Sequence, residues 1–170
     1  MTAIIAGPHV VVSDDDLRRL AETNPGWEFE RGDDGALFVS PTSTPGGAKS
    51  GEAFAQLHAY AKRAGGKAYD AATGFKTPRG GVVSPDASWV NADTVALHRD
   101  DDGFWQVMPD VVIEVASKTD SWAALKRKIE KYVGDGARYG IAIDPQTREI
   151  YELGSRPAEL TIDVAAIAGA

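Results

Sequence analysis

The sequence PDVVIEVA, residues 109–116, decides the fold of this chain. Its core is a nearly continuous apolar run, which is typical of a central strand covered on both faces. A helix is predicted from about Ser121 to Val133, ending at Gly134 and Gly136, and a second buried strand is predicted over 139–143. Two buried strands joined by a helix predict a parallel βαβ crossover.

The rest of the chain alternates short helices and strands around this unit. Ser13 is a suitable N-cap for a short helix, and the turn at 32–35 predicts a hairpin. The tail from 159 to 170 is apolar and could be a short strand or a docking segment. The other predicted elements are strands at 9–12, 27–30, 36–39, 67–69, 73–76, 85–90 and 149–153, a loop at 40–47, a helix at 48–63 and a partly helical acidic segment at 93–103.

These elements predict one α/β domain over residues 1–170, with a mixed β-sheet flanked by helices and preceded by an N-terminal helix and hairpin. The 170 residues suffice for a full-sized core. No cysteine is present, so disulfides and thiolate metal sites are excluded, and a cytoplasmic protein is expected. The net charge of −7 argues against a protein that simply coats DNA, although local charge matters more than the sum.

Glu114 is the most unusual residue, because it lies inside the apolar strand. A carboxylate there loses hydration and must be paired, protonated or bound to a metal. A buried ion pair with an Arg or Lys of a neighbouring helix explains it as well as a metal does.

Asp86 favours the metal. It follows Pro85 at the start of a predicted strand, just as Asp110 follows Pro109 before the strand of Glu114. An Asp after Pro often caps its own turn, which is the simpler explanation. If the two strands are neighbours, however, Asp86 and Glu114 converge on one cation, and Mg²⁺ prefers such oxygen ligands.

The helix after Glu114 carries a candidate cation for the same place. At about 100° per residue, Lys128 falls on a flank of the apolar stripe, and its stem can follow the core to the edge of a site. A solvated basic face is the better explanation for Arg127 and Lys131, which point away from the stripe.

Three stretches resemble the Uma family of restriction-endonuclease-like proteins, within the PD-(D/E)XK superfamily. They are SPDASWV at 84–90, PDVVIEVASKTD at 109–120 and KIEKYVGDGARYGIAIDPQTREIYEL at 128–153. The resemblance extends from about Trp27 to Leu153. It implies a restriction-endonuclease-like fold and a site dependent on Mg²⁺ (or Mn²⁺), in which Asp86 and Glu114 bind the metal.

Several positions depart from the superfamily pattern. Ala116 stands where the usual Lys would be, and the resemblance implies that Lys128 replaces it as the third catalytic residue. Ser50 stands where the first long helix often has His or Asn. Glu30 matches an acidic residue of the family's hairpin, with a surface salt bridge as the alternative. Glu52 points away from its helix stripe and is not expected to reach the metal.

Three functions are consistent with these residues. The first is a metal-dependent endonuclease that hydrolyses DNA phosphodiester bonds, and the resemblance also implies a homodimer. The second is a catalytically degenerate binding or assembly module, in which Lys128 would bridge Asp86 and Glu114. The third is an enzyme acting on a small phosphorylated substrate.

The tryptophans give a further set of expectations. Trp27, Trp89 and Trp122 fall in predicted strands or in a helix stripe, where core packing explains them better than base stacking. Trp105 follows Gly103 and Phe104, and is expected to be exposed and available for a partner contact.

Overall fold

Strand β8 (Val111–Val115) lies at the centre of the larger of two sheets, as its apolar run predicts. The computed structural model describes residues 2–4, 12–41, 43–98 and 103–170. The strand order of this sheet is β10-β9-β8-β7-β4, and only β8 and β9 are parallel to each other. Its other strands are β4 (Lys67–Asp70), β7 (Ala87–Val90), β9 (Tyr139–Ile143) and β10 (Ile150–Gly154).

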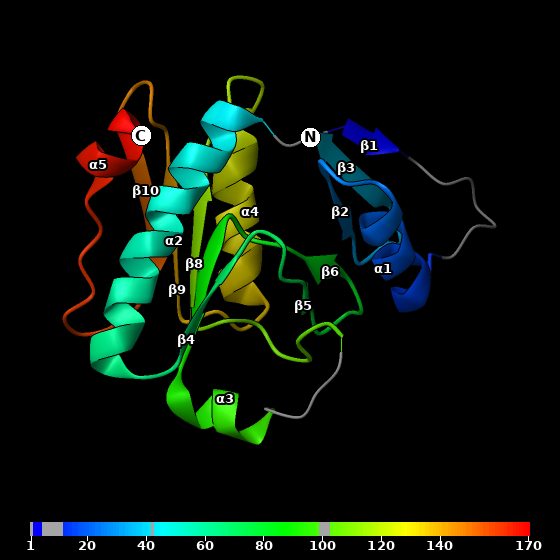
Figure 1. The fold of residues 1–170 in the computed structure, drawn as a ribbon, viewed down its shortest axis with the longest axis horizontal. Helices are drawn as coiled ribbons and strands as arrows, with labels where there is room; N and C mark the ends of the chain where they lie inside the picture. Colours follow the sequence, from blue (N-terminus) through cyan, green and yellow to red (C-terminus); the bar gives the residue numbers. More distant parts are fainter. Residues whose placement is uncertain (1, 5–11, 42, 99–102) are drawn as a thin grey trace.

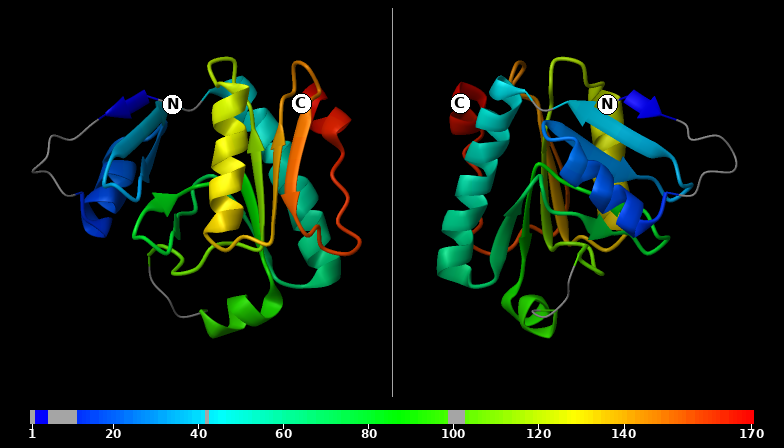
Figure 2. Two further views of the ribbon diagram at one scale, coloured as in Figure 1. Left: turned by 180° about the vertical axis from the view of Figure 1, so that it is seen from behind. Right: turned by 45° about the vertical axis from the view of Figure 1, so that its right-hand side comes forward.

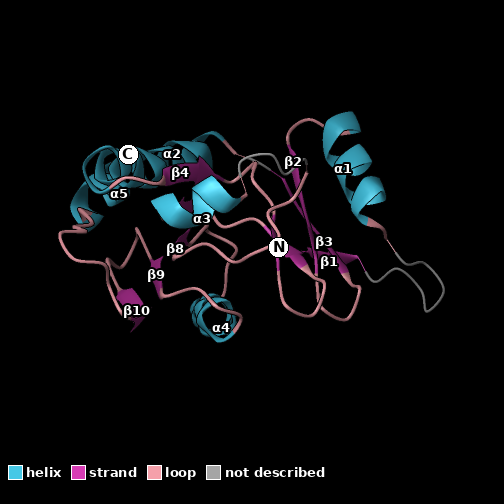
Figure 3. Ribbon diagram, turned by 90° about the horizontal axis from the view of Figure 1, so that it is seen from below, coloured by secondary structure: helices cyan, strands magenta, loops and turns pink. Residues whose placement is uncertain are grey.

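Helices cover both faces of this sheet (Figures 1 and 3). Helices α2 (Thr44–Ala64) and α5 (Val164–Gly169) lie on one face, and α4 (Trp122–Gly134) lies on the other. Side chains of β8 alternate between the two sides, because successive residues of a strand point in opposite directions. Val111 and Ile113 pack in the cluster that contains α2, whereas Val112 packs in the cluster that contains α4. Glu114 therefore points toward α4.

The predicted crossover is present, with α4 connecting the parallel strands β8 and β9. Gly140 of β9 lets this helix approach the sheet closely. A Cβ atom at Gly140 would lie 2.8 Å from Ile129 Cγ2 of α4 and 3.1 Å from Val112 Cγ2 of β8. The helix thus packs where only a glycine leaves enough room.

A second, smaller sheet was not expected from the sequence (Figure 2). It is antiparallel throughout, with the order β1-β3-β2-β6-β5. The predicted hairpin forms β2 and β3, and α1 (Asp14–Thr23) begins at the predicted cap Ser13. The strands are β1 (Thr2–Ile4), β2 (Trp27–Arg31), β3 (Leu37–Pro41), β5 (Phe75–Lys76) and β6 (Val82–Val83).

An ionic cluster ties the smaller sheet to α4. Lys131 Nζ lies 2.8 Å from Asp33 Oδ2 and also pairs with Asp135. Arg79 joins the same two carboxylates, at 2.8 Å from Asp33 and 3.4 Å from Asp135. Burial favours the protonated form of Asp33, but hydrogen bonds from Lys131, Thr77 and Arg79 outweigh it and hold its pKa well below the ordinary value. Asp33 is therefore a charged anchor between the hairpin turn and the helix.

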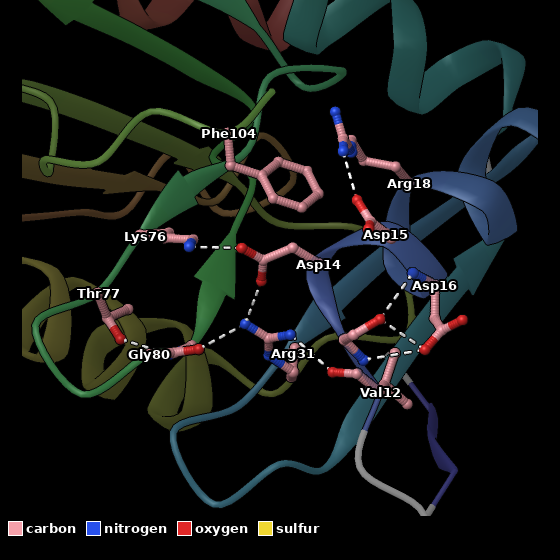
Figure 4. Close-up of polar contacts among 12 residues, drawn as sticks. Val12, Asp14, Asp15, Asp16, Arg18, Arg31, Lys76, Thr77, Gly80 and Phe104 are labelled. Carbon is pink, nitrogen blue, oxygen red and sulfur yellow. Dashed lines mark hydrogen bonds and ion pairs between the residues drawn. The ribbon is translucent and has the colours of Figure 1, made fainter. Parts of the chain in front are cut away.

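A second set of contacts fastens α1 to this sheet (Figure 4). The Arg31 guanidinium of β2 donates to Val12 O at 2.6 Å, to Gly80 O at 2.7 Å and to Asp14 Oδ1 at 2.7 Å. Asp14, at the first turn of α1, also pairs with Lys76 of β5. One arginine thus joins three segments that are far apart in the sequence.

Helix α2 begins at Thr44, within the predicted loop and before the predicted start at Ala48. The Ser43 side chain accepts from Gly46 N, and Pro45 stands in the first turn. A hydroxyl cap followed by Pro is a helix start signal, and it outweighs the low helix propensity of Gly46 and Gly47.

Other expectations meet mixed outcomes. Trp89 and Trp122 pack in the core, but Trp27 is 48% exposed at the start of β2, so core packing was the wrong prediction for it. Trp105 is partly buried, with its ring 5.4 Å from Tyr69, rather than free for a partner.

The remaining segments add two short helices. The tail forms α5, which packs through Ile167, and α3 (Ala92–Leu97) lies in the acidic segment. Residues 99–102, and 9–11 of the predicted first strand, lie outside the described residues. Within the described part of the chain, no helix combines the length and apolarity needed to cross a membrane.

Candidate functional site

Asp86 and Glu114 lie at the same end of two neighbouring strands of the larger sheet. Ala87 of β7 is paired with Ile113 of β8 in antiparallel register, Asp86 directly precedes β7, and Glu114 directly follows Ile113. Val115 N donates to Asp86 Oδ2 at 2.7 Å, which fixes this end of the strand pair. Residues opposite each other on antiparallel strands bring their side chains together on one face. The condition for a shared site is thus met.

The carboxylate of Asp86 is held from two sides and stays partly exposed. Besides Val115 N, Ser50 Oγ of α2 lies 3.2 Å from Asp86 Oδ1 and donates to it. Burial raises the pKa of Asp86, while the bond from Val115 N and the charge of Lys128 oppose that rise. Both oxygens of Asp86 are therefore oriented by hydrogen bonds from the protein.

The carboxylate of Glu114 is almost fully buried and contacts α4. Glu114 Oε1 accepts a hydrogen bond from the Tyr132 hydroxyl at 2.8 Å and lies 2.9 Å from the Lys128 ammonium. The residue is 4% exposed. Burial raises the pKa of Glu114 to about 8, although the charge of Lys128 works in the opposite direction. The negative charges of Asp86 and Glu30 add to the rise.

Lys128 lies between carboxylates of both sheets. Its ammonium is 2.9 Å from Glu114 Oε1 and 3.4 Å from Glu30 Oε1. Burial disfavours the charged form of Lys128, but Glu114 and Glu30 outweigh burial and raise its pKa well above the ordinary value. Lys128 is therefore a permanent cation rather than a group that gives up its proton.

The smaller sheet supplies two more carboxylates, both from β2. Glu30 is 7% exposed and accepts from Ser84 N at 2.7 Å, so the surface salt bridge considered for it is wrong. Glu28 lies two residues earlier on the same face of the strand. Burial raises the pKa of Glu28 to about 6, and the charges of Asp86 and Glu30 contribute to the rise. The cluster thus spans both sheets.

The structure therefore brings together the three residues predicted for the site: Asp86, Glu114 and Lys128. Their catalytic use stays a prediction. Glu52 accepts a hydrogen bond from Gln56 on its own helix at 3.0 Å and has no contact with this group, in keeping with its predicted direction.

Two members of the cluster were missed from sequence. Glu28 could have been found from Glu30, since residues two apart share a strand face. Tyr132 could have been found from Lys128, since it stands four residues later, the spacing that places two side chains side by side on a helix.

The donor set suits a hard divalent cation such as Mg²⁺ or Mn²⁺. Four carboxylates, of Glu28, Glu30, Asp86 and Glu114, lie around one ammonium. Burial raises the pKa of Glu28, Asp86 and Glu114, and the negative charges of neighbouring carboxylates add to the rise. Within the described ranges, however, no three His, Cys, Asp or Glu side chains are grouped to hold a metal ion. A cation would thus rely on two carboxylates, with water and substrate oxygens completing its shell, as Mg²⁺ commonly does.

Comparisons with known proteins agree on one class. Residues 14–161 match the model of a family described as "Uma2: Putative restriction endonuclease". A crystal structure of a "putative nuclease belonging to DUF820" from Anabaena variabilis ATCC 29413 has a similar fold, with a TM-score of 0.64 and 17% identity. The match covers 93% of this chain and 92% of that one. A comparison with curated proteins gave no match.

Proposed function

We propose, from the premise that this chain belongs to the Uma2 family, that it is a metal-dependent endonuclease that hydrolyses phosphodiester bonds in DNA. The observation that carries the proposal is that the neighbouring strands β7 and β8 bring Asp86 and Glu114 to one end of the strand pair, with the Lys128 ammonium 2.9 Å from Glu114. A nuclease needs a cation site and a fixed positive charge next to each other, and this arrangement offers both.

Each residue has a distinct part in the proposed reaction. Asp86 and Glu114 would hold Mg²⁺, which when bound supplies a polarised phosphoryl oxygen and a more acidic water. Lys128 places a permanent positive charge where the scissile phosphate gains negative charge. Glu30 accepts from Ser84 N and lies 3.4 Å from Lys128, which keeps the ammonium at the site.

The test is a cleavage assay with Mg²⁺ or Mn²⁺ on duplex DNA, single-stranded DNA and small nucleotides side by side. D86N, E114Q and K128M should each lower DNA cleavage by about 100-fold or more, because each removes a charge used in the transition state. E52Q is the matched control, since Glu52 accepts a hydrogen bond from Gln56 of its own helix, and it should cleave like the wild type. Cleavage of nucleotides alone would support the small-substrate function instead.

A catalytically degenerate binding module is the second candidate, favoured by one observation. Glu114 already has partners within the protein, Tyr132 and Lys128, as such a module requires. The bridge expected for a module, from Lys128 to both Asp86 and Glu114, is different here: Lys128 joins Glu114 to Glu30. DNA binding that persists in E114Q, without cleavage by the wild type in Mn²⁺, would establish the module.

The homodimer also stays a proposal. Light scattering on the purified protein, across a range of concentrations, measures its mass directly. A mass of twice 18.0 kDa is expected, and a mass of 18.0 kDa at every concentration would contradict the dimer.

A further inference from the structure

The hydroxyl of Tyr132 is a polar group buried in an apolar cluster. The residue has no exposed surface, and its ring packs among Phe75, Val112 and Ile129. A buried hydroxyl costs free energy unless it is hydrogen-bonded, and a Phe would fill the same space without that cost. The partner of the hydroxyl is Glu114 Oε1, at 2.8 Å. The hydroxyl therefore serves the carboxylate rather than the packing.

Both donors to Glu114 act on the same oxygen. Oε1 receives the Tyr132 hydroxyl and the Lys128 ammonium, at 2.8 and 2.9 Å. Among the residues that the structure describes, no donor contacts Oε2. Two donors on one oxygen fix the rotation of the carboxylate and leave the other oxygen for a different partner.

The ring of Tyr132 makes a second contact with the site. Lys128 lies one helical turn earlier on α4, and its Nζ is 5.6 Å from the centroid of the Tyr132 ring. An ammonium at this distance over an aromatic face is attracted to it. One side chain thus touches both the acidic and the basic member of the cluster, through different atoms.

We propose that Tyr132 is a positioning residue, which through its hydroxyl turns Glu114 so that Oε2 faces the cation position beside Asp86. The inference rests on the proposed function for the purpose of that orientation. Tyr132 itself touches neither metal nor substrate, and it acts only through Glu114.

The test compares Y132F with the wild type and with Y151F. Y132F removes one oxygen and keeps the ring, so the contact with Lys128 survives. Y151F is the matched control, because the hydroxyl of Tyr151 in β10 also donates to a glutamate of α4, Glu130, at 3.1 Å, but at an exposed position. Mn²⁺ affinity is measured by calorimetry at one pH, a metal-free crystal structure of each variant is solved, and thermal unfolding confirms that each variant is folded.

Y132F should show a rotated Glu114 carboxylate in its metal-free crystal structure and bind Mn²⁺ about tenfold more weakly or worse, in the range usual for groups that orient metal ligands. Y151F should match the wild type in both measurements. An unmoved Glu114 carboxylate in Y132F overturns the proposal, and so does an unchanged Mn²⁺ affinity when the wild type binds the ion.

The two proposals fail in different ways. A wild-type protein without Mn²⁺ affinity contradicts the metal-dependent function, and the metal-free crystal structures then decide alone whether Tyr132 positions Glu114. A purely structural role for Tyr132 predicts a lower unfolding temperature in Y132F with the carboxylate in place, which is the overturning result.

Discussion

At the scale of single residues, Lys128 holds the candidate site together. Its ammonium neutralises part of a cluster in which Glu114 and Glu30 are both nearly buried. Because its pKa lies well above the ordinary value, it stays charged at any physiological pH. Its chemistry is therefore that of a fixed charge, and a search for the base of the reaction should begin elsewhere.

Replacing this lysine should expose the repulsion it relieves. K128M leaves the carboxylates of Glu114 and Glu30 without their cation, which should cost about 3–5 kcal/mol of unfolding free energy at pH 8.5, as is usual when one partner of a buried pair is removed. K126M, on the other flank of α4, should cost less than about 1 kcal/mol, because the ammonium of Lys126 lies over the Tyr151 ring at 5.9 Å and is not part of the acidic cluster. Urea unfolding measures both values.

The same experiment has an internal check. Adding E114Q to K128M should recover part of the loss, because the second change removes a charge that the first left unpaired. Strictly additive losses would show that Lys128 and Glu114 do not interact as their 2.9 Å separation indicates.

At the scale of elements, the position of α4 on the sheet depends on Gly140. G140A should destabilise the protein by about 1–3 kcal/mol, because the new methyl would lie 2.8 Å from Ile129 Cγ2 and overpack the contact. G134A, at the end of the same helix, is the control, since no atom lies within 4 Å of the added methyl there. The control should be neutral or slightly stabilising. Equal stability of the two variants would contradict the tight contact.

The elements that could be predicted are those with a strong local signal. The apolar run of β8, the glycine stop after α4 and the turn at 32–35 each specify a structure within a few residues, and all three are present. The second sheet had no such signal, because β5 and β6 have two residues each and join the distant β2 only through the pair Arg31 and Val82. Short strands of this kind are decided by tertiary contacts rather than by pattern.

The same reasoning applies to the site. Glu114 was identified because a carboxylate inside an apolar strand is unusual. Asp86 was identified because it follows Pro85 before a predicted strand, as Asp110 follows Pro109. The strand pattern places Glu28 on the same face as Glu30, but it gives no information that β2 reaches the site, because that contact is made between the two sheets. Tyr132 contacts Glu114 through its hydroxyl oxygen, which is the one polar atom of an otherwise apolar side chain. A hydrophobic pattern gives no information about that atom.

At the scale of the whole molecule, stability should fall as pH rises. The folded-state pKa values of Glu114, about 8, and Glu28, about 6, lie above the ordinary 4.5. The folded protein therefore binds more protons than the unfolded chain between about pH 4.5 and 8. Below that range both groups are protonated, and their contribution to stability is fully present. It is lost as pH rises through about 6 for Glu28 and about 8 for Glu114.

Thermal unfolding of the metal-free protein at pH 5.5, 7 and 8.5 measures this dependence. The unfolding temperature should decrease along the series. In E114Q, most of the decrease above pH 7 should be absent, because Gln does not titrate. Mg²⁺ at pH 8.5 should restore stability to the wild type, since a ligand that binds only the folded state stabilises it. A wild-type unfolding temperature that is constant or rises between pH 5.5 and 8.5 would contradict the buried cluster.

The arrangement of the cluster across two sheets has a consequence for biosynthesis. The acidic residues Glu28, Glu30, Asp86 and Glu114 leave the ribosome before Lys128 and Tyr132 do, because the latter two belong to α4. A nascent chain that ends at Val115 thus carries four acids of the cluster and neither of the α4 donors. The cluster is assembled only when α4 has emerged and packed on the larger sheet, so a translation product that ends before α4 has an incomplete cluster.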